Sequence, residues 1–194
     1  MLTLITHSAG ETRKTGEALG GLLAPGDVIA LDGDLGSGKT TLVQGIAAGW
    51  GSPDRVTSPT FVIINVYTRP PASVQDENFH AERSSDSLSV RTQSKRLPST
   101  ASDLRSSSAQ DERIHHMDAY RLTSPAEAAD LDLDACLAAG PLVVEWASQI
   151  REALPDDFLH IAMTWLDDER RGLDITARGE RYEKMLAHLA GFLP

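Results

Sequence analysis

Short apolar runs alternate along this chain with stretches in which apolar residues recur at helical spacing. The run at residues 28–31 is long enough for one strand, and residues 41–48 then follow the period of a helix. A second run, residues 142–144, is apolar throughout and is closed by Glu145, which is typical of a strand buried on both faces. Strands and helices in alternation predict an α/β fold.

The pattern predicts elements over most of the remaining chain. Further strands are expected at residues 2–6, 60–67, 114–120, 158–165 and 173–177, the last two forming a hairpin. Further helices are expected at residues 8–23, 133–139 and 180–192, and another from Ser124. Ser8 and Glu11 have capping-box spacing, and Gly49 and Gly51 are expected to end the helix that contains residues 41–48.

The segment between the strand at 28–31 and the helix at 41–48 fits the phosphate-binding pattern G-x-x-x-x-G-K-[ST] without a mismatch. It consists of Gly33, Asp34, Leu35, Gly36, Ser37, Gly38, Lys39 and Thr40, with Thr41 next. A strand that leads through a glycine-rich turn into a helix directs backbone N–H groups and the positive helix end at one point. We expect Lys39 to reach the β- and γ-phosphates of a nucleoside triphosphate and the Thr40 hydroxyl to bind Mg²⁺. The alternative is a glycine-rich turn that happens to carry a lysine.

Hydrolysis also needs a metal held from a second side and a positioned water. Glu145 and Trp146 stand at the end of the apolar run 142–144. Because ligands of open α/β sheets sit beyond the carboxyl ends of the strands, Glu145 is expected to face Mg²⁺ across from Thr40. The alternative is a surface acid that ends a strand.

Another acid lies in the segment His-Met-Asp-Ala-Tyr-Arg at residues 116–121. Alternation along a strand predicts that His116, Asp118 and Tyr120 share one side. Three roles are open to Asp118: it could orient the attacking water, accept its proton, or bind the metal through water. For His116 we expect a hydrogen-bonded structural histidine, and for Arg121 either a phosphate contact or an ion pair.

Residues 57–61, Thr-Ser-Pro-Thr-Phe, lie where other P-loop proteins place a switch that senses the γ-phosphate. Thr60 or Ser58 is expected to bind Mg²⁺ or the γ-phosphate. The alternative is a turn capped by hydroxyl groups, which Pro59 also favours.

Composition limits the class of protein. The 194 residues suit one domain, residues 1–194, and the net charge of −10 argues against direct binding of nucleic acid. No apolar run approaches 20 residues, the start of the chain lacks the pattern of a signal peptide, and the single Cys136 excludes an internal disulfide. We expect a cytoplasmic protein that does not enter a membrane.

Residues 70–113 depart from the pattern. Eleven of these 44 residues are serine, with charges of both signs and few apolar side chains. Such a stretch cannot bury enough surface to offset its ordering entropy, so we expect a disordered insertion between the strands at 60–67 and 114–120. A docking or phosphorylated segment is the alternative.

Four segments, in this order and at this rough spacing, resemble the TsaE family, also called YjeE, of bacterial tRNA-modification ATPases. They are residues 33–41 (GDLGSGKTT), 58–61 (SPTF), 116–122 (HMDAYRL) and 144–146 (VEW). Many ATPases share the first segment, but its combination with the other three is specific. The family usually has a short connection in place of residues 70–113, and both flanking motifs remain intact.

The resemblance implies the P-loop NTPase three-layer fold, with a central largely parallel sheet and antiparallel edge strands. It implies an ATP-hydrolysing accessory protein, required to form the threonylcarbamoyl group on adenosine 37 of tRNA. The implied partners are TsaB and the transferase TsaD, and tRNA would be reached only through their complex.

The resemblance also implies roles for individual residues. The implied catalytic residues are Lys39, Asp118 and Glu145, and the implied Mg²⁺ ligands are Thr40 and Glu145. The residues implied to bind ATP are Gly33, Asp34, Leu35, Gly36, Ser37, Gly38, Lys39, Thr40, Thr41, Thr60 and Trp146. Residues around Ser8, and Arg170 or Arg171, are further candidates to approach the nucleotide.

Two other functions use the same loop. A small-molecule P-loop kinase usually closes a basic lid over the phosphates. The one long loop expected here, residues 70–113, has seven acids against six bases, which argues against a kinase. A guanine-nucleotide switch ranks last, because the chain has no Asn-Lys-x-Asp sequence.

Overall fold

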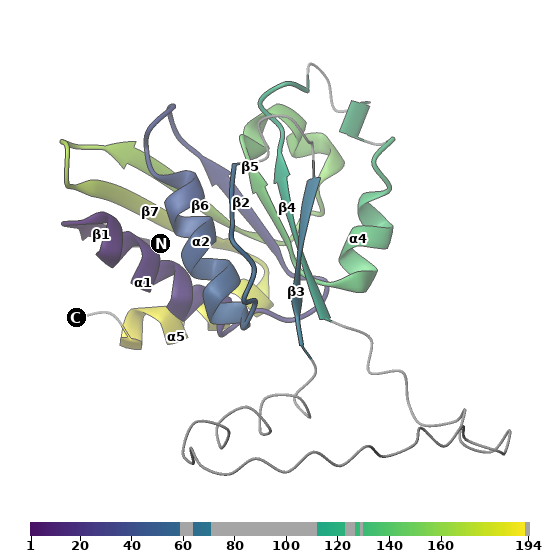
Figure 1. The fold of residues 1–194 in the computed structure, drawn as a ribbon, viewed down its shortest axis with the longest axis horizontal. Coiled ribbons are helices and arrows are strands. Elements are labelled where there is room, and N and C mark those ends of the chain that lie inside the picture. The colour runs from purple at the N-terminus through teal and green to yellow at the C-terminus, as the bar shows by residue number, and fades with distance from the viewer. Residues whose placement is uncertain (59–63, 71–111, 123–126, 129, 193–194) are drawn as a thin grey trace, which may run out of the picture. The chain divides into compact units, whose positions relative to one another are not determined.

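The computed structural model describes residues 1–58, 64–70, 112–122, 127–128 and 130–192 (Figure 1). Contacts within the chain define one unit of Met1–Arg69 with Glu112–Pro194 and a second of Pro70–Asp111. All elements given below belong to the first unit. Thr60, the helix start at Ser124 and nearly all of the expected insertion at 70–113 lie outside the described residues.

Seven described strands form one mixed sheet in the order β1-β7-β6-β2-β5-β4-β3. They are β1 Leu2–Thr6, β2 Val28–Asp32, β3 Ile64–Arg69, β4 Glu112–Asp118, β5 Leu142–Glu145, β6 Phe158–Trp165 and β7 Arg171–Arg178. The four middle strands β6, β2, β5 and β4 pair in parallel, whereas β1, β7 and β3 join by antiparallel pairing. The expected α/β class and the late hairpin are confirmed, and parallel pairing is confined to the middle of the sheet.

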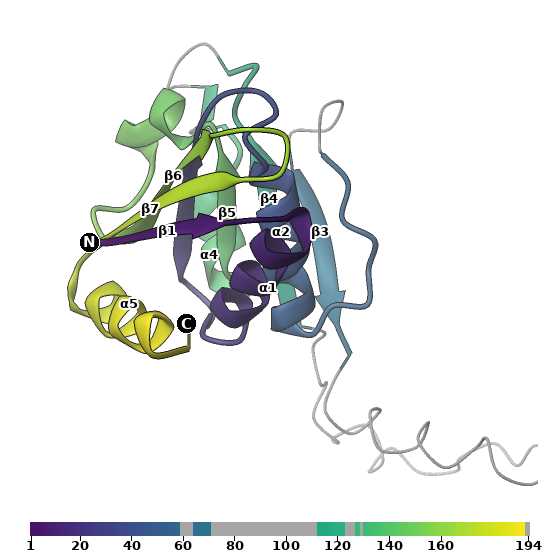
Figure 2. The same cartoon turned by 90° about the vertical axis from the view of Figure 1, so that its left-hand side faces the viewer.

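Helices cover both faces of this sheet (Figures 1 and 2). The helical elements are α1 Ala9–Gly20, α2 Lys39–Trp50, α4 Leu133–Ala139, the 3₁₀ helix η3 Ala147–Ala153, and α5 Glu180–Phe192. Helices α1, α2 and α5 share one apolar core with Ile29 and Leu31 of β2, while α4 and η3 share the other with Val28 and Ala30. Strand β2 is therefore apolar at successive positions because both of its faces are covered. None of the described helices is long and apolar enough to cross a membrane.

Helix α1 begins as its sequence predicts, with the Ser8 hydroxyl accepting the Glu11 N–H at 3.1 Å. Its end was expected at residue 23, but the helix stops at Gly20. A turn follows, in which the N–H groups of Leu22 and Leu23 donate to the carbonyl oxygens of Leu19 and Gly20. Two adjacent glycines, Gly20 and Gly21, lower the helix propensity at that point.

Glycines also let α1 and α2 approach closely. A Cβ at Gly45 would lie 2.0 Å from the carbonyl oxygen of Arg13, and one at Gly49 would lie 2.0 Å from that of Glu17. Gly49 was expected to end α2, but it lies inside the helix and serves this contact. Gly51, with φ of 93°, is the residue that ends α2.

Candidate active site

The glycine-rich loop joins β2 to α2. Gly33, Gly36 and Gly38 have positive φ of 145°, 80° and 99°. A Cβ at Gly33 would also lie 2.3 Å from the carbonyl oxygen of Met163, so the loop depends on glycine there. The N-cap of α2 is Gly38, so no side chain caps the helix, and its first N–H groups are available to an anion.

Thr40 and Glu145 meet where β2 and β5 end. These strands are parallel neighbours in which Leu31 pairs with Glu145, so Glu145 stands beside the residue that leads into the loop. The Thr40 hydroxyl, in the first turn of α2, donates to Oε1 of Glu145 at 2.9 Å. Glu145 is 3% exposed, so it is not a surface acid.

This pair of oxygen ligands fits Mg²⁺. Magnesium prefers hard oxygen ligands and takes one or two from protein, with phosphate oxygens and waters completing an octahedron. The described part of the chain has no group of three or more His, Cys, Asp or Glu side chains that could hold a metal. A threonine hydroxyl and a glutamate carboxylate match the kind and number of ligands that Mg²⁺ takes from protein.

His116 contacts Glu145, and Tyr67 contacts His116. His116 is fully buried, and its Nε2 lies 3.0 Å from the same Oε1 of Glu145. Nδ1 of His116 lies 3.3 Å from the hydroxyl of Tyr67, which in turn lies 3.2 Å from the carbonyl oxygen of Thr57. His116 is thus the hydrogen-bonded histidine that was expected, while its acidic partner and Tyr67 had no signal in the sequence.

The ammonium group of Lys39 lies inside this site. Nζ donates to the carbonyl oxygens of Gly33 at 2.6 Å and Asp34 at 3.0 Å, and it lies 4.2 Å from the ring centroid of Trp146. Burial lowers the pKa of Lys39, and the charges of nearby acids, Glu145 foremost, oppose that shift. Trp146 reaches this position because its backbone is left-handed, with φ of 59°.

These groups surround one cavity of about 360 Å³, which is within the size range of small-molecule sites. Its lining includes most residues predicted to bind nucleotide or metal: Leu35, Gly36, Gly38, Lys39, Thr40, Thr41, Asp118, Glu145 and Trp146. Gly33, Asp34 and Ser37 belong to the same loop without lining the cavity. Thr60 lies outside the described residues, and Ser58, the alternative to it, lines the cavity.

The strand that carries Asp118 ends earlier than expected. β4 stops at Asp118 rather than at residue 120. The Ala119 N–H still bonds to β5, at the carbonyl of Glu145, and the Tyr120 N–H then donates to Oδ1 of Asp118 at 2.9 Å in a turn that ends the strand. The expected alternation therefore covers only His116 and Asp118. Tyr120 still reaches the cavity from the turn, with its ring 5.0 Å from that of Trp146.

Arg171, at the start of β7, adds a positive charge beside the loop. Its Nη1 donates to the backbone oxygens of Asp167 at 2.6 Å and Arg170 at 2.9 Å, and its Nε is buried with no partner among the described residues. Arg171 lines the cavity, whereas Arg170 pairs with the Asp167 carboxylate at 2.6 Å on the surface. Ser8, the other candidate, caps α1 and is not among the lining residues.

Comparison with known proteins gives concordant matches. The sequence model of the family described as "Threonylcarbamoyl adenosine biosynthesis protein TsaE" matches residues 6–82 and 90–173. A tRNA threonylcarbamoyladenosine biosynthesis protein TsaE of Bacillus subtilis is 33% identical, covering 95% of this chain and 91% of that protein. The protein of that name from Streptomyces coelicolor is 33% identical over 88% of this chain and 93% of its own length. The crystal structure of YdiB from Bacillus subtilis is similar with a TM-score of 0.64 and 29% identity, covering 98% of this chain and 95% of that one.

Proposed function

This chain belongs to the TsaE family of threonylcarbamoyl adenosine biosynthesis proteins, and we propose that it acts there as a Mg²⁺-dependent ATPase. Its role is in the biosynthesis of threonylcarbamoyladenosine in tRNA. The observation that carries the proposed reaction is the 2.9 Å hydrogen bond between Thr40 and Glu145. It joins the end of the phosphate-binding motif to the acid of a different strand, beside the ammonium group of Lys39.

We assign the binding of the triphosphate to the loop and the first turn of α2. Backbone N–H groups and the helix end favour the phosphates, in the manner of the P-loop NTPase fold. Lys39 supplies a positive charge in a partly desolvated place, where charge interactions are stronger than in water. Thr40 and Glu145 are the proposed Mg²⁺ ligands, and a bound Mg²⁺ would neutralise part of the charge of the β- and γ-phosphates.

Asp118 and Arg171, which also line the cavity, are further proposed participants in hydrolysis. The hydrogen bond from the Tyr120 N–H fixes the carboxylate of Asp118 at the cavity, where it can orient the attacking water or accept its proton. Arg171 has a buried N–H without a partner among the described residues, so a phosphate oxygen would satisfy it. Its charge suits the charge that develops on the transferred phosphoryl group.

We further propose that the protein works with TsaB and TsaD homologues, which would handle the tRNA. A net charge of −10 disfavours direct binding to the phosphate backbone of nucleic acid. The rim of the cavity also exposes two large apolar side chains, Leu35 at 91% and Tyr120 at 61%, which a partner could cover.

The proposal is tested by measuring ATP hydrolysis by the full chain, alone and with the TsaB and TsaD homologues, together with the tRNA modification in cells. Slow Mg²⁺-dependent hydrolysis alone is expected. Lys39→Ala should abolish hydrolysis and leave cells that carry only this form without the modification, while Lys14→Ala, at an exposed position of α1, should do neither.

Two results would overturn it. Normal modification in cells that carry only the Lys39→Ala form would show that the nucleotide site is not needed. Labelled γ-phosphate recovered on an acceptor other than water would instead support the small-molecule kinase.

A further inference from the structure

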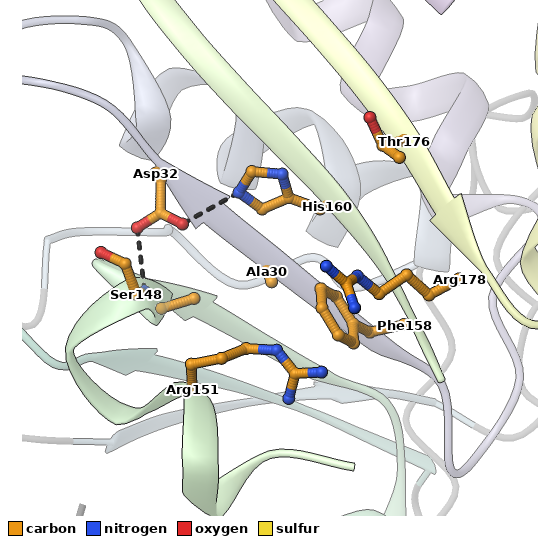
Figure 3. Close-up of a pocket in the computed structure, with 9 residues that line it drawn as sticks. Ala30, Asp32, Ser148, Arg151, Phe158, His160, Thr176 and Arg178 are labelled. Carbon is orange, nitrogen blue, oxygen red and sulfur yellow. Dashed lines mark hydrogen bonds and ion pairs between the residues drawn. The ribbon is translucent and has the colours of Figure 1, made fainter. Parts of the chain in front are cut away.

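A second cavity, of about 550 Å³, lies on the opposite face of the sheet, beside η3. Its lining residues come from β2, η3, β6 and β7: Ala30, Asp32, Ala147, Ser148, Arg151, Phe158, His160, Thr176 and Arg178 (Figure 3). None of them lines the cavity around Lys39. We name this space the Phe158 cavity.

The strand register builds its floor. Ala30 pairs with His160, and His160 pairs with Thr176, so one row of side chains crosses three strands. Phe158 and Arg178 form the neighbouring row on the same face. The methyl group of Ala30 fills little of the space above β2, which leaves room for a ligand.

Helix η3 supplies the wall. Its backbone leaves helical geometry at Ile150, with φ of −123°, and Ser148 and Arg151, one on each side of that kink, both line the cavity. Figure 3 shows both of them at the cavity, with the guanidinium group of Arg151 on the side of Phe158. The sequence of residues 147–153 is too short to reveal this face by periodicity.

Two guanidinium groups converge on one aromatic ring. Cζ of Arg151 lies 4.3 Å from the ring centroid of Phe158, and Cζ of Arg178 lies 5.4 Å from it. Among the described residues neither arginine pairs with a carboxylate, and Arg151 makes only long bonds, of 3.4 and 3.3 Å, to the carbonyl oxygens of Leu154 and Pro155. In Figure 3 the ring of Phe158 lies between the two guanidinium groups, so each of them offers its charge on its own side of the ring.

The acid in the cavity is already engaged. Asp32 accepts the N–H of Ser148 at 3.0 Å through Oδ1 and faces Nε2 of His160 at 2.9 Å through Oδ2. Burial raises the pKa of Asp32, but these hydrogen bonds outweigh it and hold the pKa below its ordinary value. Its carboxylate is thus occupied on both oxygens, and the two arginines remain as the charge offered to a ligand.

We propose that the Phe158 cavity binds a small organic anion, a carboxylate or phosphate compound, through the guanidinium groups of Arg151 and Arg178 that line it. The planar donors of arginine match both oxyanions, and the buried side chains Phe158, Ala30 and Ala147 give the cavity an apolar lining. The volume falls within the range of small-molecule sites. The occupant would touch Asp32, which precedes the glycine-rich loop, and Ser148, which follows Glu145 and Trp146 on the chain.

The test is an NMR titration of the full chain with benzoate, phenyl phosphate and the neutral benzamide. Benzoate or phenyl phosphate should shift the backbone signals of Ser148, Arg151, His160 and Arg178 saturably, and which of the two binds more tightly distinguishes a carboxylate from a phosphate. Benzamide should bind about tenfold more weakly, because it lacks the charge that strengthens the hydrogen bonds. The absence of saturable shifts, or shifts confined to residues 36–41, would overturn the proposal.

Substitutions of the two arginines test whether their charges bind the anion. Arg178 is exposed and makes no hydrogen bond with a described residue, so Arg178→Gln should fold and weaken binding of the anions by about tenfold or more. Arg151→Gln should have the same effect, and Arg13→Gln, on α1 at the opposite face, should have none. Unchanged affinity in both Arg178→Gln and Arg151→Gln would refute the site.

Discussion

Nε2 of His116 lies 3.0 Å from Oε1 of Glu145, and both side chains are buried. The same carboxylate oxygen accepts the Thr40 hydroxyl at 2.9 Å, so one atom of Glu145 is fixed from two elements. His116 thus stands behind the proposed Mg²⁺ ligand and orients it, without lining the cavity itself.

We predict that His116→Leu raises the Mg²⁺ concentration needed for half-maximal ATP hydrolysis by about 10- to 100-fold, as loss of an outer partner of a metal ligand does. His116→Gln keeps an N–H donor at a similar reach and should restore much of that loss. Tyr67→Phe leaves the bond to Glu145 intact and should have a smaller effect. An unchanged Mg²⁺ requirement in a folded His116→Leu protein would rule out the positioning role.

Arg171 and Arg170 should differ sharply in their effect on hydrolysis. Arg171→Gln is expected to lower kcat about 100-fold, the usual loss for one group that stabilises developing charge. Arg170→Gln should leave kcat nearly unchanged, since Arg170 pairs with Asp167 on the surface. Steady-state kinetics at saturating Mg²⁺ measure kcat for both variants. Equal losses of kcat would contradict the assignment of Arg171 to the transferred phosphoryl group.

The Asp32–His160 pair should make stability depend on acid pH. The pKa of Asp32 in the folded chain lies below its ordinary 3.8, because hydrogen bonds to its carboxylate outweigh the effect of burial. A group with a depressed folded pKa stabilises the protein above the unfolded value, and that contribution is lost as pH falls through the folded one. Urea unfolding from about pH 5 to about pH 2 should therefore show a shallower decline for Asp32→Asn than for the parent. The same change at exposed Asp156 serves as the control.

The close approach of α1 and α2 predicts opposite effects for two glycine substitutions. Gly49→Ala places a Cβ 2.0 Å from the Glu17 carbonyl oxygen, a backbone atom that cannot move aside, and should lower the free energy of unfolding by about 1–3 kcal/mol. Gly10→Ala, where the nearest atom is Ser8 Oγ at 3.6 Å, should raise it by about 0.5–1 kcal/mol. Urea denaturation measures both, and equal effects would mean that the helix contact does not limit Gly49.

Local pattern predicted most of the described elements. The bounds of β1, α4, β5, β6 and α5 agree with the expectation from sequence, because their apolar periods and capping residues act within a few neighbours. The ends of α1 and β4 did not agree, since a local turn follows each of them, after Gly20 and after Asp118. Helix η3 was not expected, because seven residues in a 3₁₀ helix leave no distinct period.

The sequence predicted most residues that line the candidate site and the meeting of Thr40 with Glu145, but not the side chains behind them. The phosphate-binding loop has a pattern fixed by backbone sterics, and an acid that ends an apolar strand has a known position relative to a sheet. No local pattern predicted that His116 and Tyr67 stand behind Glu145, because that depends on β4 lying between β5 and β3.

By itself the sequence determined which segments form strands and helices, and where a phosphate-binding turn occurs, because these follow from interactions between residues close in the chain. The tertiary structure decided which side chains meet across strands: His116 with Glu145, 29 positions apart, and Asp32 with His160, 128 apart. Strand order and register set such meetings, since a shift by one residue turns every side chain to the opposite face. The Phe158 cavity depends on that register, and Arg151 of η3 and Arg178 of β7 reach the Phe158 ring only in the folded chain.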